Sequence, residues 1–304
     1  MENRKIGIWM YQNGGGDVIQ EKLKKKLIER DMTPYSGLNL YHAYADSLGL
    51  FCNQIQMDEL DLFFSYNAGE QTVYQMYLYE ALSRFIPTIN NYSAFALTED
   101  KFKTLNVLRK AGIPTTEFVL CHRDDKERVH RIFEFWDHKL IYKPVDGWGG
   151  VGMVKIEGEQ ALDFVLPFMS KTDLRFFYLE RFIPNDGSDF RVDVVDGQFI
   201  SCYGRKAGRG EWRTNVTSGG KVIIREANDQ LVSLAIKAAK ATGLEVAGVD
   251  LLYDLEREEY VVMEVNGIPA FATPDQEAMG LDFNNKKIDA LVELIDRRSR
   301  EGIR

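Results

Sequence analysis

The sequence of 304 residues is poor in cysteine and has no long hydrophobic run. Its three cysteines, Cys52, Cys121 and Cys202, lie far apart in the chain. An odd number at this spacing predicts neither a disulfide framework nor a zinc site and is typical of the reducing cytoplasm. Because no stretch approaches about 18 apolar residues, a membrane-spanning helix is excluded. The N-terminal apolar stretch is too short for a secretory signal, so we expect a cytoplasmic protein with no membrane partner.

Histidine is also scarce: the four residues, His42, His122, His130 and His138, never occur in a metal-binding spacing and are expected at the surface or in packing. The net charge of −8 argues against a nucleic-acid partner. Charge is uneven, however, because residues 191–225 carry seven basic side chains and three acidic ones. That segment indicates either a local anionic ligand or a solvated basic loop.

The first ninety residues alternate between strand and helix patterns. Apolar runs at 5–10 and 61–65 predict buried strands, and each is followed by a helical pattern, at 17–31 and around 74–82. This order predicts a small α/β layer with parallel strands. The Asn-Gly-Gly-Gly turn at 13–16 lacks the Rossmann spacing and is interpreted as a tight turn rather than a phosphate loop.

The rest of the chain mixes helices with strands joined by short turns. A helix after residue 98 has Thr98 as its expected N-cap and ends before Gly112 and Pro114. A second helix ends at Gly243. The remaining predicted elements are strands near 116–121, 139–144, 151–156, 175–183, 189–197, 198–206, 245–254 and 259–266, and helices near 124–136, 159–170 and 286–298.

Gly147, Gly149 and Gly152 match the pattern G-x-G-x-x-G. A Rossmann turn requires a helix after this loop, but residues 151–156 are typical of a strand. A protein kinase requires its catalytic motifs downstream, whereas His-Arg-Asp occurs upstream at 122–124 and no Asp-Phe-Gly is present. The sequence leaves a glycine-rich flap between strands, which either cradles phosphate with its N–H groups or is a plain hairpin.

Asp250 and Glu264 are acidic residues inside otherwise apolar strands. A turn centred on residue 257 would place them directly opposite each other, with Asn266 following on the same face. Two carboxylates about 5 Å apart repel by about 3 kcal/mol at an effective dielectric constant near 20, unless a cation lies between them. Oxygen ligands of this kind suit Mg²⁺. The alternative is a polar strand edge that faces solvent.

Three further charged residues are candidates for the same site. Lys101 lies near the start of its helix, and Lys143 ends a strand at the mouth of the flap. With a flap and a carboxylate pair in the same chain, phosphate binding accounts for both lysines. Glu180 is a charge in an apolar strand and either binds an adenine amino group or pairs with a nearby arginine.

In this order, the motifs resemble those of the ATP-grasp superfamily, and within it the RimK-like amino-acid ligases. The resemblance covers about residues 55–296 and includes TEDKFKTLNVLRKAGIP, LIYKPVDGWGGVGMV, YLERFI, SDFRVDVVDG, GEWRTNVTSGG, VAGVDLL and VMEVNGIP. It implies an α/β (α+β) ATP-grasp fold with an N-terminal α/β domain at 1–92, a central lid at 93–178 and a C-terminal antiparallel-sheet domain at 179–304. ATP would be held between two sheets.

The resemblance also implies roles for individual residues. Lys101, Lys143, Gly149 and Gly150 would bind phosphates, Glu180 and Arg181 would border the adenine, and Asp189 would lie near the ribose. Thr214 and Asn215 would meet the phosphates beside Arg213, which would act in catalysis. Asp250, Glu264 and Asn266 would bind Mg²⁺, with Mn²⁺ as the alternative ion. Arg191 and Arg205 are candidates for binding substrate carboxylates.

The implied activity is ATP-dependent ligation of a carboxylate to an amine through an acyl phosphate. The partners would be an amino acid and a small-molecule or peptide carboxylate, and a homo-oligomer is compatible with the sequence. A small-molecule phosphotransferase and a non-catalytic nucleotide-binding scaffold are the alternatives. The chain departs from the family pattern at Trp148, Ile268, Ala270 and Ser218, so the resemblance does not imply glutamate as the amine.

Overall fold

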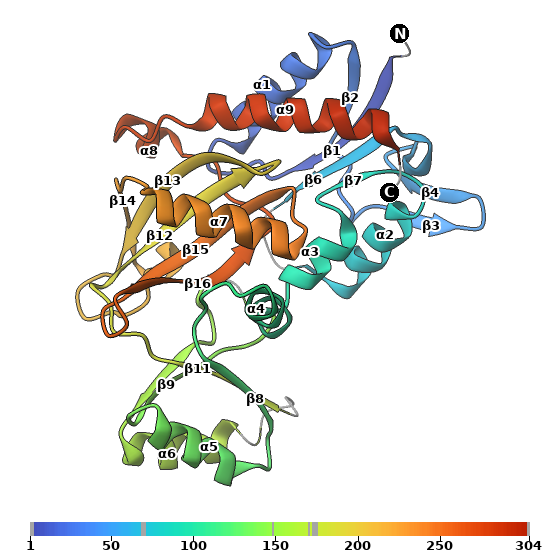
Figure 1. The fold of residues 1–304 in the computed structure, drawn as a ribbon. Helices are drawn as coiled ribbons and strands as arrows, with labels where there is room; N and C mark the ends of the chain where they lie inside the picture. The colour runs from blue at the N-terminus through green and yellow to red at the C-terminus, as the bar shows by residue number, and fades with distance from the viewer. Residues whose placement is uncertain (1–2, 68–70, 148, 170, 172–175, 303–304) are drawn as a thin grey trace.

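The computed structural model describes residues 3–302 except 68–70, 148, 170 and 172–175, and its main feature is three larger β-sheets with helices packed on them, beside a fourth, smaller sheet (Figure 1). Every helix among these residues is too short or too polar to span a membrane. Trp148, one of the positions at which the sequence departs from the family pattern, lies outside the described residues.

The first sheet is parallel and belongs to the N-terminal part of the chain. Its order is β2-β1-β6-β7. The strands are β1 (Arg4–Met10), β2 (Met32–Ser36), β6 (Leu62–Tyr66) and β7 (Thr88–Ile89). Ile8 of β1 packs with α1 (Gly16–Ile28) and α9 (Asn284–Glu301). Trp9 belongs to the core on the other face, under α2 (Val73–Ser83). Both faces are therefore buried, as in other parallel sheets, and the predicted α/β layer is confirmed.

A small antiparallel sheet of three short strands extends from this part of the chain and was not predicted from the sequence. The strands are β3 (Tyr44–Asp46), β4 (Gly49–Cys52) and β5 (Ile55–Gln56). Tyr74 of α2 donates a hydrogen bond to the carbonyl of Ala43 and so ties this sheet to the N-terminal layer. The strands are too short to show a clear alternation of polar and apolar residues.

The second sheet is antiparallel and lies at the bottom of Figure 1, apart from the other layers. Its order is β10-β9-β11-β8. The strands are β8 (Phe118–His122), β9 (Lys139–Tyr142), β10 (Val154–Glu157) and β11 (Phe176–Arg181). Helices α5 (Lys126–Phe135) and α6 (Glu159–Met169) cover one face, around a core that includes Phe133, Leu140 and Phe177. We call residues 118–181 the lid.

The third sheet has five antiparallel strands in the order β14-β13-β12-β15-β16. The strands are β12 (Ser188–Val195), β13 (Gln198–Lys206), β14 (Lys221–Ile223), β15 (Val246–Asp254) and β16 (Glu259–Asn266). Val192 and Val194 of β12 face a core formed with α4 (Lys101–Lys110) and α7 (Asp229–Thr242). Because side chains alternate along a strand, the residues between these valines face the opposite side, which we call the polar face.

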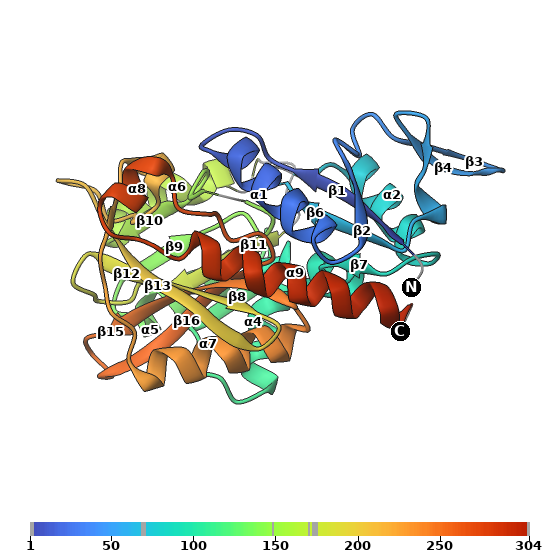
Figure 2. The ribbon, with the colours of Figure 1, turned by 90° about the horizontal axis from the view of Figure 1, so that it is seen from above.

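Helix α9 connects the N-terminal layer to the five-stranded sheet. It lies beside α1 and contacts both β6 and β12 (Figure 2). The short helix α8 (Pro274–Ala278) precedes it. Helix α7 ends at Gly243, whose φ of 77° is the left-handed value expected of a helix C-cap, as predicted.

The predicted cap of α4 was wrong by two residues. Thr98 is the last residue of α3 (Tyr92–Thr98), a separate short helix. The N-cap of α4 is Asp100, whose carboxylate accepts a hydrogen bond of 2.9 Å from the N–H of Lys103. Asp100 fits this place because a carboxylate binds free N–H groups and also favours the positive end of the helix.

The predicted domain boundaries remain predictions, and the sheets favour a narrower lid. The boundary at 178/179 falls inside β11, which pairs with β8 on both sides of that point and with β9 from Leu179 onward. The segment at 93–110 packs against α7 and the five-stranded sheet rather than against the lid helices. We therefore propose residues 118–181 as the lid, because a strand and its pairing partners fold as one unit.

Candidate active site

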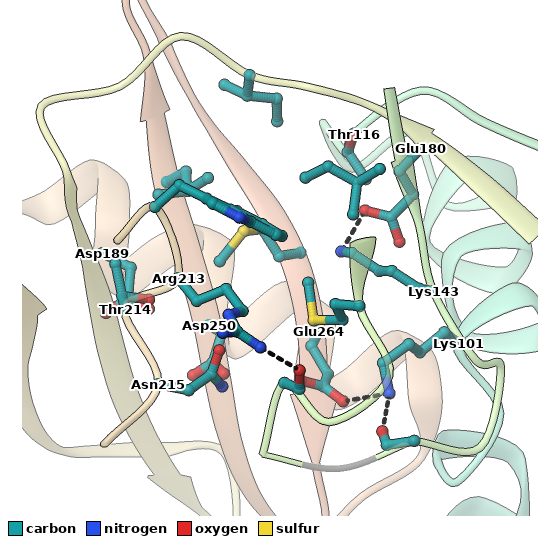
Figure 3. Close-up of a pocket in the computed structure, with 18 of the residues that line it drawn as sticks. Lys101, Thr116, Lys143, Glu180, Asp189, Arg213, Thr214, Asn215, Asp250 and Glu264 are labelled. Atoms are coloured by element: carbon teal, nitrogen blue, oxygen red, sulfur yellow. Dashed lines mark hydrogen bonds and ion pairs between the residues drawn. The ribbon is translucent and has the colours of Figure 1, made fainter. Parts of the chain in front are cut away.

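A cleft with an empty volume of about 910 Å³ lies between the lid and the polar face of the five-stranded sheet (Figure 3). Of the residues predicted for the site, all except Arg191 and Asn266 line it. The predicted lining residues are Lys101, Lys143, Gly149, Gly150, Glu180, Arg181, Asp189, Arg205, Arg213, Thr214, Asn215, Asp250 and Glu264. Arg191 lies directly behind Asp250, and Asn266 ends the strand that carries Glu264.

Asp250 and Glu264 are direct cross-strand partners, as predicted, but the symmetric hairpin assumed for them is wrong. The strands pair Asp254 with Glu259 next to the turn, and uninterrupted pairing would place Asp250 opposite Met263. A β-bulge between Asp250 and Leu251 shifts the register by one residue, so that Asp250 pairs with Glu264. The bulge also explains why the consecutive residues Met263 and Glu264 both line the cleft, since it re-aims one side chain.

Asp250 is buried between two arginines. Arg191 donates two hydrogen bonds to its carboxylate, and Arg205 Nη2 lies 2.9 Å from Oδ2. Burial alone would raise the pKa of Asp250, but the two guanidinium groups outweigh it and hold the pKa below the usual value. Arg205 also binds Asp189, which accepts a hydrogen bond from Thr214. The four charges in this cluster cancel, so the group is neutral as a whole.

Glu264 has a lysine partner instead. Lys101, the first residue of α4, places Nζ 3.1 Å from Glu264 Oε1 and also donates to the carbonyl of Gly147 in the flap. Burial opposes the charge of Lys101, but Glu264 and the nearby Glu180 raise its pKa overall. In Figure 3 the ammonium group lies between the strand that carries Glu264 and the flap. One cation therefore connects the carboxylate pair to the glycine-rich loop.

Lys143 and Glu180 form a second, deeper pair. Lys143 Nζ donates to Glu180 Oε2 over 2.5 Å, and the hydroxyl of Tyr178 donates to Glu180 Oε1 over 2.9 Å. The partner of Glu180 is thus a lysine, not the arginine considered from the sequence. Arg181 turns away toward Glu117, Asp254 and Glu256.

The flap touches the segment that follows β13. Arg213 Nη1 donates to the carbonyl of Gly150 over 3.3 Å, and Thr217 Oγ1 donates to the carbonyl of Gly149. Both glycines have positive φ values, 63° at Gly149 and 76° at Gly150, and a Cβ on Gly150 would come within 2.8 Å of Asn215 Oδ1. Glycine is therefore required here both by conformation and by close approach. Hydrogen bonds from Arg213 lower the pKa of Glu211 to about 2, which keeps this acid ionised beside the arginine.

The apolar part of the cleft was not predicted from the sequence. Its lining includes Ile141, Met153, Leu252 and Met263, together with Phe182 and Trp212, whose rings meet edge to face at 6.5 Å. A mostly apolar slot with a few polar groups suits a nucleobase. The six residues come from six separate segments, and apolar side chains of this kind give no local signal that distinguishes them from core.

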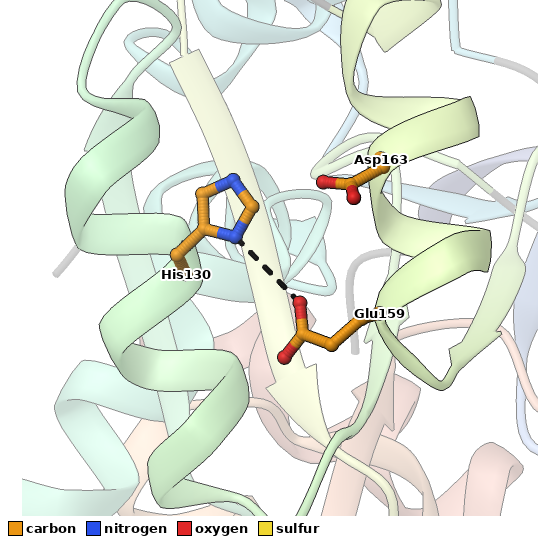
Figure 4. A group of neighbouring side chains, drawn as sticks. All are labelled: His130, Glu159 and Asp163. Carbon is orange, nitrogen blue, oxygen red and sulfur yellow. Dashed lines mark ion pairs between the residues drawn. The ribbon is translucent and has the colours of Figure 1, made fainter.

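A cluster on the lid brings one histidine into a group with acidic residues. His130 of α5 lies beside Glu159 and Asp163 of α6, although its sequence spacing predicted no metal site (Figure 4). His130 is partly buried, both acids are exposed, and Glu159 already bonds to His138 Nδ1 at 2.8 Å. Exposed groups of this kind occur commonly without an ion, so the cluster carries no assignment.

Comparison with known sequences identifies a family for this chain. The family model described as a RimK-like ATP-grasp domain matches residues 98–291. The tetrahydromethanopterin:alpha-L-glutamate ligase of Methanocaldococcus jannaschii is 31% identical over 221 residues, which cover 71% of this chain and 74% of that protein. A probable alpha-L-glutamate ligase of Trichodesmium erythraeum is 32% identical over 208 residues, 67% of each chain.

Solved structures confirm the predicted ATP-grasp fold. The ATP-grasp ligase PsnB complexed with a minimal precursor superimposes with a TM-score of 0.70 at 19% identity, covering 96% of this chain and 99% of that chain. The D-alanine–D-alanine ligase of Bacillus anthracis complexed with ATP has a TM-score of 0.67 at 17% identity, with 99% of both chains covered. Because these sequence identities are below 25%, the two structures show that the fold is shared and nothing further.

Proposed function

Because the chain belongs to the RimK-like ATP-grasp family of carboxylate–amine ligases, we propose that it uses ATP to join an amino acid to a carboxylate acceptor. The observation that carries this proposal is the Asp250–Glu264 pair in the cleft, with Lys101 and Arg213 beside it. Anionic ligands bind where cations converge on a closed site, and the polyphosphate of ATP meets that description.

The residues also fit a divalent cation. Two carboxylates and the amide of Asn266 provide oxygen ligands, which suit Mg²⁺, with Mn²⁺ as the alternative ion. Asn266 Nδ2 is buried and makes no hydrogen bond to the described residues, so no such bond fixes the amide away from the site. When bound, the ion would neutralise phosphate oxygens and orient the transferred phosphoryl group.

The reaction follows from the poor reactivity of a carboxylate. An acceptor carboxylate oxygen attacks the γ-phosphorus of ATP, which gives an acyl phosphate and ADP. The amine then attacks the acyl carbon and loses a proton, and phosphate leaves as the amide forms. Positioned cations supply most of the catalysis in phosphoryl transfer, which is the role proposed for Lys101, Lys143 and Arg213. Exclusion of water by the lid would protect the acyl phosphate from hydrolysis.

The described geometry supports nucleotide placement in the apolar slot. We propose that the base lies between the lid residues Ile141 and Met153 and the sheet residues Leu252 and Met263. Glu180 would accept from an exocyclic amino group, and Asp189 would lie near the ribose. Arg191 and Arg205 now bind Asp250, so a substrate carboxylate would share these arginines with it.

The partners proposed from the relatives are an amino acid, with glutamate as the first candidate, and a small-molecule or peptide acceptor. The M. jannaschii relative is named for glutamate and tetrahydromethanopterin. Ile268 and Ala270 change the loop after Asn266, where the family pattern has serine and glycine. The partly buried Ile268 packs against two hydrophobic cores, so it offers no polar group to a substrate there.

Trapping the acyl phosphate tests the proposal. ADP release would first be screened across carboxylate acceptors and amino acids in the presence of Mg²⁺. Hydroxylamine would then replace the amino acid for each acceptor that is turned over, and an acyl phosphate would give a hydroxamate. A phosphorylated product that is stable and yields no hydroxamate would contradict ligation and favour a phosphotransferase. The Glu264→Gln variant is the matched control and should form neither product.

A further inference from the structure

In the loop at residues 267–271, every residue except Ile268 has a backbone group hydrogen-bonded to a side chain from a distant element. It directly follows Asn266, the last residue of β16. The carbonyl of Gly267 accepts a hydrogen bond of 2.7 Å from Asn90 Nδ2. The carbonyl of Pro269 accepts one of 2.6 Å from the hydroxyl of Tyr66, and the N–H of Phe271 donates to the hydroxyl of Tyr11 over 3.0 Å. All three of these side chains belong to the N-terminal part of the chain.

Lys287 of α9 lies at the centre of this arrangement. Its side chain is fully buried, and Nζ donates to the carbonyls of Pro269 and Ala270 over 2.7 and 3.0 Å. The third bond, of 2.9 Å, goes to the carboxylate of Asp193, which is also fully buried. Nζ lies 4.7 Å from the ring centroid of Phe271. A lysine is rarely buried unless its charge is paired and its three N–H groups are used, and here all three are.

The sheet register places this ion pair beside the proposed metal ligands. Across the polar face, Asp193 pairs with Gly248, and Gly248 pairs with Asn266. The next row, two residues along β12, contains Arg191, Asp250 and Glu264. Asp193 therefore shares a row with Asn266, and Lys287 connects that row to the loop after it.

Gly248 explains how the loop can lie so close to the sheet. A Cβ at this position would come within 2.7 Å of Pro269 Cβ and 2.8 Å of Arg191 Nη1. Its φ is not among the positive values, so the reason for glycine here is space alone. Pro269 and Arg191 thus both pack over the same glycine, which couples the position of the loop to the arginine that holds Asp250.

From these contacts we propose that Lys287, paired with Asp193, is a positioning residue that holds the 267–271 loop so that Asn266 can bind the metal ion. The inference rests on the proposed metal role of Asn266. The lysine acts through the loop backbone rather than by touching substrate. Groups that orient metal ligands typically change metal affinity or activity by about 10- to 100-fold when removed.

The test uses a neutral pair of similar shape, Asp193→Asn with Lys287→Met. Removing one charge alone would leave the other buried and unpaired, whereas removing both leaves no unpaired charge while the loop carbonyls lose their donor. The matched control is Arg298→Met with Glu245→Gln, which removes another largely buried ion pair made by α9, with a separation of 2.9 Å. The backbone N–H of Glu245 donates to Asn90 Oδ1, and this bond does not involve either substituted side chain. Mg²⁺ is titrated into each full-length protein in the presence of ADP, and hydrogen exchange is measured at the amides of Phe271 and Ala272.

We expect the double variant, with Asp193→Asn and Lys287→Met combined, to raise the Mg²⁺ dissociation constant by about tenfold or more. The amide of Phe271 should exchange faster, while that of Ala272, which donates to Asn284 Oδ1, should change less. The control should stay within about twofold of the unmodified protein in Mg²⁺ affinity, because its residues do not touch the loop. An unchanged Mg²⁺ affinity in the folded double variant, or an equal change in the control, would overturn the inference.

A second variant covers the case in which the double variant does not fold. Tyr66→Phe keeps the aromatic ring and removes only the hydroxyl bonded to Pro269, so it should shift the Mg²⁺ affinity and the exchange of Phe271 in the same direction by a smaller factor. No shift in either would overturn the inference. Hydrogen exchange needs no nucleotide. If the unmodified protein bound no Mg²⁺ with ADP, the proposed function would fail, and the exchange of Phe271 would still decide whether Lys287 anchors the loop.

Discussion

Replacing Asp250 with asparagine should affect folding as well as chemistry, whereas replacing Glu264 with glutamine should affect mainly chemistry. Both residues are proposed metal ligands, so each change should reduce ATP turnover by about 100-fold or more. Their surroundings differ, however. The side chain of Asp250 is 5% exposed and its partner Arg191 is 10% exposed, while Glu264 is 28% exposed.

The loss of folding stability in each variant follows from the charges that remain after the substitution. Arg191, Arg205, Asp189 and Asp250 sum to zero, and Asp250→Asn leaves one uncompensated positive charge in a buried cluster. Removing one partner of a buried ion pair typically costs about 3–5 kcal/mol. Glu264→Gln leaves Lys101 with Glu180 nearby and a partly solvated site, so about 1 kcal/mol is expected.

Urea denaturation at pH 7 without nucleotide or metal measures the difference in unfolding free energy between Asp250→Asn and Glu264→Gln. With an m-value of about 3 kcal/mol/M, a gap of about 3 kcal/mol moves the midpoint by about 1 M. Because the arginines hold the folded-state pKa of Asp250 below the usual 3.8, its contribution is complete above that value and is lost as the pH falls through the lower folded-state pKa. The gap between the two variants should therefore persist at pH 5 and close only in stronger acid.

Adding Arg191→Met to Asp250→Asn removes the stranded cation and should recover part of the lost stability. The reasoning would be refuted if Asp250→Asn unfolded within about 1 kcal/mol of the unmodified protein, a cost typical of an exposed pair. It would also be refuted if the double variant were no more stable than Asp250→Asn alone.

Two further predictions concern the flap and the cysteines. Thr217→Val removes the hydroxyl that bonds Gly149 and should raise the KM for ATP by about two- to tenfold, which corresponds to the loss of one hydrogen bond. Thr217→Ser keeps a hydroxyl and should have the KM of the unmodified protein. Equal KM values for all three proteins would contradict a role of Thr217 in holding the flap. Burial raises the pKa of Cys121 to about 11 and that of Cys202 to about 12, so thiol labelling at pH 8 should be slow and should speed up by about tenfold per pH unit toward pH 10. Labelling of both cysteines within seconds at pH 8 in the folded protein would contradict the raised pKa values of their thiols.

The local features were predictable because their signals are local. Strands β1 and β6, the helix that ends at Gly243 and the strand after the flap all follow from short-range pattern and turn chemistry. The cross-strand pairing of Asp250 with Glu264 was also predicted, but from a symmetric hairpin that the structure does not have. Only the structure reveals the bulge at Met263 that makes the register agree.

Ion-pair partners were much less predictable. The arginine considered as a partner of Glu180 proved to be Lys143, and the adenine role of Glu180 stays a prediction. Arg191 and Arg205, considered as substrate ligands, bind Asp250, a contact that the sequence did not indicate. The N-cap of α4 was misplaced because Thr98 and Asp100, two residues apart, are both favoured N-cap residues. Its selection depends on α3, which packs into the core and ends at Thr98.

The sequence by itself determined which chemical groups this protein has: an ordered set of two lysines, an arginine and two acids in strands, together with a glycine-rich loop that tolerates close approach. Tertiary structure decided which of them meet. Lys287 and Asp193 are 94 residues apart, and neither has a pattern that marks it. They are brought together because α9 packs across both β6 and β12. A charge requires a partner of this kind only when the fold has removed water from around it, and the sequence alone does not show where that happens.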